Sequence, residues 1–227
     1  MNQIFQFCER YGTWAYVILV AIVIASMSLH EVAHAWVAWK RGDSTAKDLG
    51  RITLNPLAHI SLVITIIVPI VSLLLIGIPF GGAKPVPVDF SRLKKPYFDM
   101  ALVAIAGPLS NILLAIGGGV VFHALVNVTK SIEPVSFPSH LVVVWISTNL
   151  YLAAFNLLPL PPLDGSRVLN FFLPPPLRPI FRRLDLIGVV VLLLLFFYYP
   201  PLGGWILAIQ DRLFDLNFAI VTLGGLW

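Results

Sequence analysis

The chain has 227 residues, of which 58% are apolar and 11% are charged, and its mean hydropathy is +0.90. Soluble domains carry about 25% charged residues, so this composition excludes a water-soluble globular protein. The formal net charge of +4 does not indicate a nucleic-acid partner, because the basic residues lie in short loops between apolar stretches, where they orient a protein in its membrane. The single cysteine excludes an internal disulfide.

Apolar stretches follow one another along the whole chain. Several are close to the length of about twenty residues that an α-helix needs to cross a bilayer. We therefore expect an all-α polytopic membrane protein, a bundle of about four to six transmembrane helices in one integral-membrane domain over residues 1–227. The apolar stretches are 14–39, 62–80, 99–127, 140–158 and 186–209.

Two polar segments interrupt the early part of this pattern. Residues 42–60 are turn-rich and predict a short strand. Residues 81–88 are expected to be extended, because a residue that precedes proline avoids the helical region. Such re-entrant or β-hairpin elements offer free strand edges, and we expect that an unwound substrate can be held there by main-chain hydrogen bonds.

The first apolar stretch contains the sequence His30-Glu31-Val32-Ala33-His34. In a helix, His30 and His34 lie one turn apart on the same face, so both rings can reach one ion, and Glu31 lies beside that face. Ionisable side chains within a membrane helix are costly, and a polar cluster that only joins helices is the alternative explanation. The motif therefore predicts one zinc ion per chain.

A catalytic zinc ion usually has three protein ligands and a position for water, so a third ligand is needed. Asp164 is the candidate that lies in a segment both apolar and irregular, where three prolines unwind the chain, but an aspartate before Gly165 is equally common as a turn residue. Asn156, in the same unwound segment, is a candidate hydrogen-bond donor to the developing oxyanion, or a cap for the freed carbonyls. The other candidate ligands are His59, His123, Glu133 and His140.

With a zinc ion and Glu31 as general base, the expected chemistry is peptide hydrolysis. A zinc or divalent-metal transporter or channel that uses the same His and Asp side chains is the alternative function. Glu31 separates the two hypotheses, because a transport site needs no general base.

Three motifs in order carry a family resemblance: HEVAH at 30–34, AGPLSN at 106–111 and NLLPLPPLDG at 156–165. With them, the chain resembles the site-2 protease family of intramembrane zinc metallopeptidases, in the compact form without a PDZ domain. This resemblance implies that His30, His34 and Asp164 ligate zinc, that Glu31 is the general base and that Asn156 assists substrate or transition-state binding. It also implies cleavage of the transmembrane segments of membrane-protein substrates.

The distribution of Lys and Arg predicts the topology. If the 62–80 stretch enters and leaves the membrane on one side, twelve basic residues are cytoplasmic and three are outside, which is a clear positive-inside bias. The same topology brings Asp164 to the depth of the two histidines. We therefore expect a re-entrant 62–80 segment, a location in the bacterial cytoplasmic membrane and an active site nearer its cytoplasmic face. The twelve are Lys40, Arg41, Lys47, Arg51, Lys84, Arg92, Lys94, Lys95, Arg167, Arg178, Arg182 and Arg183.

Overall fold

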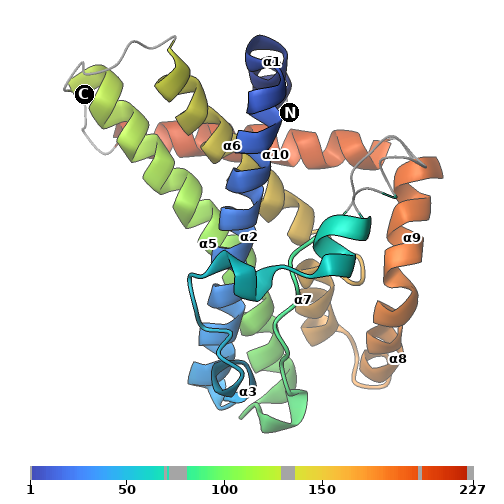
Figure 1. Cartoon of the computed structure of the whole chain (residues 1–227). Coiled ribbons are helices and arrows are strands. Elements are labelled where there is room, and N and C mark those ends of the chain that lie inside the picture. The colour runs from blue at the N-terminus through green and yellow to red at the C-terminus, as the bar shows by residue number, and fades with distance from the viewer. Residues whose placement is uncertain (1, 69–70, 72–80, 129–135, 199–200, 224–227) are drawn as a thin grey trace. The chain divides into compact units, whose positions relative to one another are not determined.

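The structure is a computed structural model that describes residues 2–68, 71, 81–128, 136–198 and 201–223, and all regular elements in these ranges are helical (Figure 1). This confirms the all-α membrane fold. The α-helices are α1 Asn2–Tyr11, α2 Thr13–Arg41, α3 Thr45–Asp48, α5 Pro96–His123, α6 Phe137–Asn156, α7 Asp164–Phe172, α8 Arg178–Arg183, α9 Asp185–Tyr198 and α10 Pro201–Leu223. Shorter helical turns are η1 Pro56–His59, η2 Leu62–Ile67, η3 Phe90–Arg92 and η4 Ala124–Val128.

Three helices of the described part are long and apolar enough to cross a membrane, namely α2, α5 with its continuation to Val126, and α6. The 29 residues of α2 make a helix of about 44 Å, which exceeds a hydrocarbon core of about 30 Å. The three predicted stretches at 14–39, 99–127 and 140–158 thus correspond to helices whose ends differ by only a few residues. The protein is a membrane protein.

The expectation of a short strand at 42–60 is wrong, because this segment forms α3 and η1 instead. At the beginning of both elements, a side-chain oxygen accepts a hydrogen bond from a backbone N–H group. Asp43 Oδ1 accepts a hydrogen bond from the Thr45 N–H at 3.0 Å, and Asn55 Oδ1 accepts one from the Leu57 N–H at 3.1 Å. Local side-chain caps of this kind compete with strand pairing for the backbone groups.

The apolar stretch 186–209 falls on parts of two helices. α9 ends at Tyr198, and α10 begins at Pro201 and continues to Leu223. Proline lacks the N–H that a helix interior needs, but it is well placed in the first turn of a new helix. The apolar composition of this stretch concealed a helix boundary.

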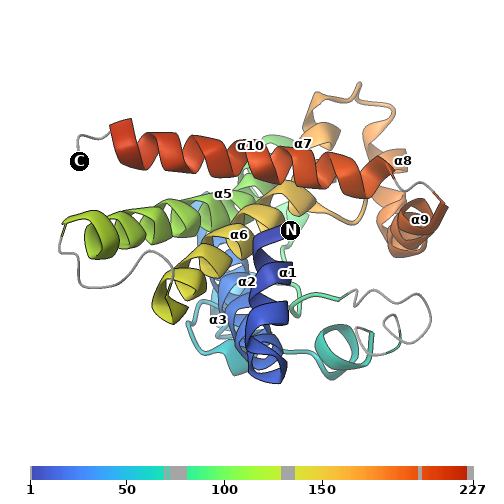
Figure 2. The ribbon, with the colours of Figure 1, turned by 90° about the horizontal axis from the view of Figure 1, so that it is seen from above.

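The chain divides into two compact units, which are described separately. The first comprises Met1–Ser26, Leu109–Phe155 and Pro201–Trp227. Figure 2 shows α10 along α5 and α6 in this unit. Polar side chains join these helices: the Asn111 amide donates to Asn149 Oδ1 at 2.9 Å between α5 and α6, and the Gln210 amide donates to the Ser147 carbonyl at 3.2 Å between α10 and α6. Hydrogen bonds of this kind hold helices together where lipid surrounds them.

The second unit comprises Met27–Pro108 and Asn156–Pro200 and contains all residues of the predicted site. The loop after α2 lies beside the segment that leads into α5. Asp43 Oδ2 accepts a hydrogen bond from the Asp89 N–H at 2.7 Å, and Arg41 Nε donates to Asp99 Oδ1 at 2.7 Å. The C-terminal end of α2 and the start of α5 are therefore fixed next to each other, as Figure 1 also shows.

The predicted re-entrant segment is covered only in part. Residues 62–67 form η2, a π-helical turn, whereas residues 69–70 and 72–80 lie outside the described residues. Residues 81–89 contain no regular element until η3 begins at Phe90, which agrees with the predicted extended segment.

The segment between α6 and α7 is unwound, as its prolines predict. The Leu163 N–H donates to the Leu160 carbonyl at 2.9 Å, and the Ser166 hydroxyl and N–H donate to the Leu163 carbonyl at 2.7 Å and 3.0 Å. The segment thus satisfies part of its own backbone, which irregular chain at membrane depth requires. α7 starts directly afterwards at Asp164.

Candidate metal centre

Two histidines of α2 form one side of the site. Their Nε2 atoms are 3.0 Å apart, and the two rings are nearly perpendicular with centroids separated by 4.6 Å. Both side chains are buried. The spacing of four residues therefore brings His30 and His34 onto the same face of α2, as the sequence predicts.

Asp164, the first residue of α7, forms the other side. Its Oδ2 lies 3.1 Å from His30 Nε2 and 3.2 Å from His34 Nε2. Burial favours the neutral acid, but the adjacent His34 and His30 rings outweigh it and hold the pKa of the Asp164 carboxyl well below its ordinary range. Asp164 is therefore both a turn residue at the start of a helix and a carboxylate that faces the histidines, so the two readings of this residue are compatible.

These three donor atoms fit a zinc ion. They form a nearly equilateral triangle with sides of 3.0 to 3.2 Å. Ligand atoms at zinc bond lengths of about 2.0–2.1 Å, placed at the corners of a tetrahedron, are about 3.3 Å apart. Two nitrogen donors and one carboxylate oxygen are also the donor types that catalytic zinc sites use, with the fourth position left for water.

Two features of α5 orient the histidine rings. His34 Nδ1 donates to the carbonyl of Val103 at 2.6 Å, which leaves the lone pair of its Nε2 directed toward the other two donors. Gly107 lies against both rings: a Cβ at this position would be 2.5 Å from His30 Nε2 and would also overlap the His34 ring. Gly107 belongs to the AGPLSN motif at 106–111, and the absence of a side chain at this position leaves space for the two histidine rings.

Glu31 lies next to the histidines and is held by the extended segment. Its Oε2 accepts a hydrogen bond from the Val86 N–H at 2.8 Å, and its side chain is buried. The role of Val86 was not predicted, because a backbone donor leaves no mark in the residue type. The prolines on either side of it, Pro85 and Pro87, predict only that this segment is extended.

The site opens into a pocket of about 120 Å³. Asn156, the last residue of α6, and Arg167 of α7 contribute to its wall together with the metal-facing side chains. The structure thus brings all five predicted site residues, Glu31, Asn156 and the three candidate ligands, to one pocket. Arg167 is an additional member that the sequence did not single out.

The segment around residue 86 is less suited to strand addition than the sequence suggests. The N–H groups of Gly82, Lys84 and Val86 already donate to other groups of the second unit. Pro85 and Pro87 have no N–H to offer. A regular row of free donors is therefore missing along the described part of this segment.

Comparison with known proteins identifies the family. YwhC of Bacillus subtilis, named as a candidate zinc metalloprotease, is 41% identical over 210 residues, which cover 89% of this chain and 91% of that protein. The chain belongs to this family of zinc metalloproteases. Rip2 of Mycolicibacterium smegmatis is 28% identical over 92% of this chain and 79% of its own length, and Rip2 of Mycobacterium tuberculosis is 30% identical over 89% and 74%. No family model and no solved structure matches significantly.

Membership of this zinc metalloprotease family agrees with the resemblance to site-2 proteases and with zinc as the cofactor. The three relatives are named as proteases, so they give no support to the transporter alternative. The buried triangle of two histidines and one aspartate is the group of the described residues that can hold the metal of this zinc metalloprotease.

Of the remaining candidate ligands, His59 belongs to the second unit but is not one of the three grouped donors. His59 is buried, and its Nε2 is 3.0 Å from the Thr53 carbonyl oxygen, while its own carbonyl accepts from the Lys84 N–H, so it supports the loop that carries the extended segment. His123 and His140 belong to the first unit, and Glu133 lies outside the described residues.

Proposed function

We propose that this zinc metalloprotease cleaves peptide bonds within the transmembrane segments of membrane-protein substrates. The observation that carries the proposal is the position of two of the three metal-facing donors, His30 and His34, within the buried part of a helix long enough to span the bilayer. In this proposal His30, His34 and Asp164 hold the zinc ion, and residues 1–227 act as one catalytic domain in the membrane. When bound, zinc supplies a Lewis acid that polarises the substrate carbonyl and lowers the pKa of water.

Glu31 is the proposed general base. It accepts the proton of the attacking water and later delivers it to the nitrogen of the leaving amine, so that it returns to its starting state after each cleavage. The Val86 N–H holds one carboxylate oxygen and thereby fixes the direction of the other lone pairs of Glu31. A base held by backbone needs little reorganisation when the substrate arrives.

Asn156 is the proposed donor to the substrate carbonyl oxygen. It lines the metal pocket at the point where α6 ends and the chain unwinds. A neutral amide in a buried pocket stabilises a developing negative charge without the desolvation cost of a cation.

The proposed location is the bacterial cytoplasmic membrane, with the site nearer the cytoplasm. The hydrogen bond from the Asp89 N–H to Asp43 and the ion pair between Arg41 and Asp99 support this topology, because they hold the two basic loops next to each other. In this proposal the two loops lie on the same face of the membrane.

The test of the proposed function is cleavage of a transmembrane model peptide by detergent-purified protein. We expect the wild type to cleave the peptide, and we expect a zinc chelator or Glu31→Gln to reduce the rate by at least about 10³-fold, because both the metal and the base are needed. Zinc content should remain near one ion per chain in Glu31→Gln. Absence of wild-type cleavage with a panel of helical substrates, or full activity of Glu31→Gln, would contradict the proposal.

A further inference from the structure

Arg51 is a buried cation that the proposed chemistry does not use. The residue is only 7% exposed, and its buried Nε has no hydrogen-bond partner among the described residues. No carboxylate of the described residues forms an ion pair with it. Arginine is almost never buried unless it is paired, because an unpaired buried charge destabilises the fold. The guanidinium at this place therefore needs an explanation other than stability.

The backbone of Arg51 is tied to α3. Its N–H donates to the Ala46 carbonyl at 2.8 Å, and the N–H of Gly50 donates to the Lys47 carbonyl at 2.9 Å. Gly50 has a φ of +67°, a conformation that favours glycine and ends the helix at this point. The side chain of Arg51 thus extends from a fixed turn.

This side chain contacts the backbone of the extended segment. Arg51 Nη2 donates to the Lys84 carbonyl at 2.6 Å. The N–H of Lys84 donates to the His59 carbonyl at 2.7 Å. Lys84 is therefore held through both of its backbone groups by the loop that follows α2.

The same loop holds the other end of the segment. Asp43 is fully buried, and its Oδ2 accepts a hydrogen bond from the Asp89 N–H at 2.7 Å. Val86 lies between the two held points and donates its N–H to Glu31 at 2.8 Å. The loop 42–60 thus frames the backbone donor of the proposed general base.

The link between Arg51 and this donor is short and stiff. The Lys84 carbonyl belongs to the peptide group before Pro85, and the Val86 N–H belongs to the peptide group after it. Each peptide group is planar, and the proline ring fixes φ near −65°, so about one free rotation separates the two groups. A carbonyl held by Arg51 therefore restricts the direction of the N–H that reaches Glu31.

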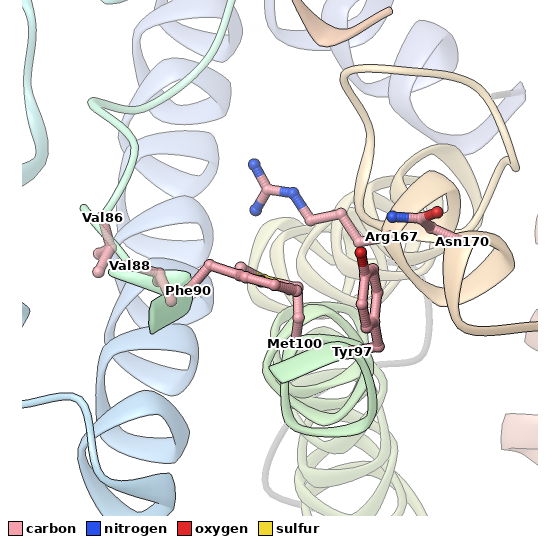
Figure 3. A pocket seen from close by; sticks show the side chains of 7 residues that line it. All are labelled: Val86, Val88, Phe90, Tyr97, Met100, Arg167 and Asn170. Carbon is pink, nitrogen blue, oxygen red and sulfur yellow. The ribbon is translucent and has the colours of Figure 1, made fainter. Parts of the chain in front are cut away.

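The segment also forms part of the wall of the site. Val86 and Val88 line a cavity of about 190 Å³, and Val86 lines the metal pocket as well. Figure 3 shows the two valines across this cavity from Arg167 and Asn170 of α7. Arg51 lines neither space, so any effect that it has on the reaction passes through the segment.

We propose that Arg51 is a positioning residue for the general base, an inference that rests on the proposed function. It holds the Lys84 carbonyl, the rigid Pro85 transmits this restraint, and the Val86 N–H then keeps Glu31 in place for the attacking water. Its cost to the fold is offset by a base that needs little reorganisation.

The test measures kcat and KM for the cleavage of a transmembrane model peptide by detergent-purified protein. Arg51→Met keeps an unbranched stem and removes the guanidinium, so we expect kcat to fall about tenfold, at the lower end of what the loss of an outer-shell partner costs. KM should change by less than about threefold, because the side chains that line the cleft are all retained. Arg51→Lys keeps the charge and one donor but not the planar head, and it should lose about threefold in kcat.

A second background separates this path from a general effect on the fold. Val86→Pro already lacks the N–H that holds Glu31, so the addition of Arg51→Met or Arg51→Lys should lower kcat by less than about twofold further. Arg92→Met removes an equal charge from a side chain that is 54% exposed and should keep the wild-type kcat. A wild-type kcat in Arg51→Met, or a loss that persists undiminished in the Val86→Pro background, overturns the inference. If Arg51→Met is too unstable to purify, Arg51→Lys decides by the same two criteria.

Amide exchange gives a readout that does not depend on cleavage. In protein with isotope-labelled valine, the Val86 N–H should exchange at least about tenfold faster in Arg51→Met than in the wild type, and at the wild-type rate in Arg92→Met. If the wild type cleaves no peptide but this acceleration appears, the proposed function is wrong and the hold of Arg51 on the Val86 N–H stands. If the wild type cleaves the peptide and the exchange in Arg51→Met is unchanged, the inference is overturned and the function stands.

Discussion

Gly107→Ala isolates the contact between α5 and the metal-facing histidines. The added Cβ would lie 2.5 Å from His30 Nε2, and an ordinary contact begins near 3.4 Å, so the rings or α5 must move apart by about 0.9 Å. Zinc sites tolerate deviations of only about 0.2 Å in their bond lengths. We expect the zinc affinity to fall at least about a hundredfold, at the upper end of what is lost when the groups that orient metal ligands are removed.

The matched control for this prediction is Gly117→Ala on the same helix, where an added Cβ meets no atom within 4 Å. Alanine is about 1 kcal/mol more favourable than glycine in a helix, so neither substitution should destabilise α5 through its backbone. Chelator competition in detergent measures the zinc affinity, and thermal unfolding of the metal-free protein measures the fold. Zinc affinity and cleavage at wild-type levels in Gly107→Ala would refute the steric role of this glycine.

Three further predictions concern the other parts of the site. Val86→Pro removes the N–H that holds Glu31, so we expect kcat to fall by at least about tenfold in a peptide-cleavage assay, whereas Val86→Ala, which keeps the N–H, should lose less than about threefold; equal losses would contradict the role of the backbone donor. Asp164→Asn removes the anionic donor and should weaken zinc binding at least about a hundredfold in a chelator titration, whereas Asp89→Asn, at a half-exposed side chain, should leave it unchanged. A normal zinc affinity in Asp164→Asn would require another ligand. Cysteines introduced at Thr45 and Phe90 should react with an impermeant reagent from the same side of the membrane, and labelling from opposite sides would refute the predicted topology.

Much of the helical framework could be predicted from the sequence. Long apolar stretches locate α2, α5 and α6 to within a few residues, because the length of a membrane helix is set by the thickness of the bilayer. The helix boundary near Pro201 was missed, since apolar composition continues across it. The turns at 42–60 were also missed, because side-chain caps at Asp43 and Asn55 decide there between helix and strand.

The sequence by itself determined that this zinc metalloprotease is a membrane protein and that His30 and His34 share one face of a helix, because helical periodicity is a local property. The position of Asp164 was decided only by the tertiary structure. It lies 134 residues from His30 in the sequence. The two side chains meet because the unwound segment after α6 ends beside His30. The hydrogen bond from the Val86 N–H to Glu31 depends likewise on packing between distant segments, which no local pattern of residues encodes.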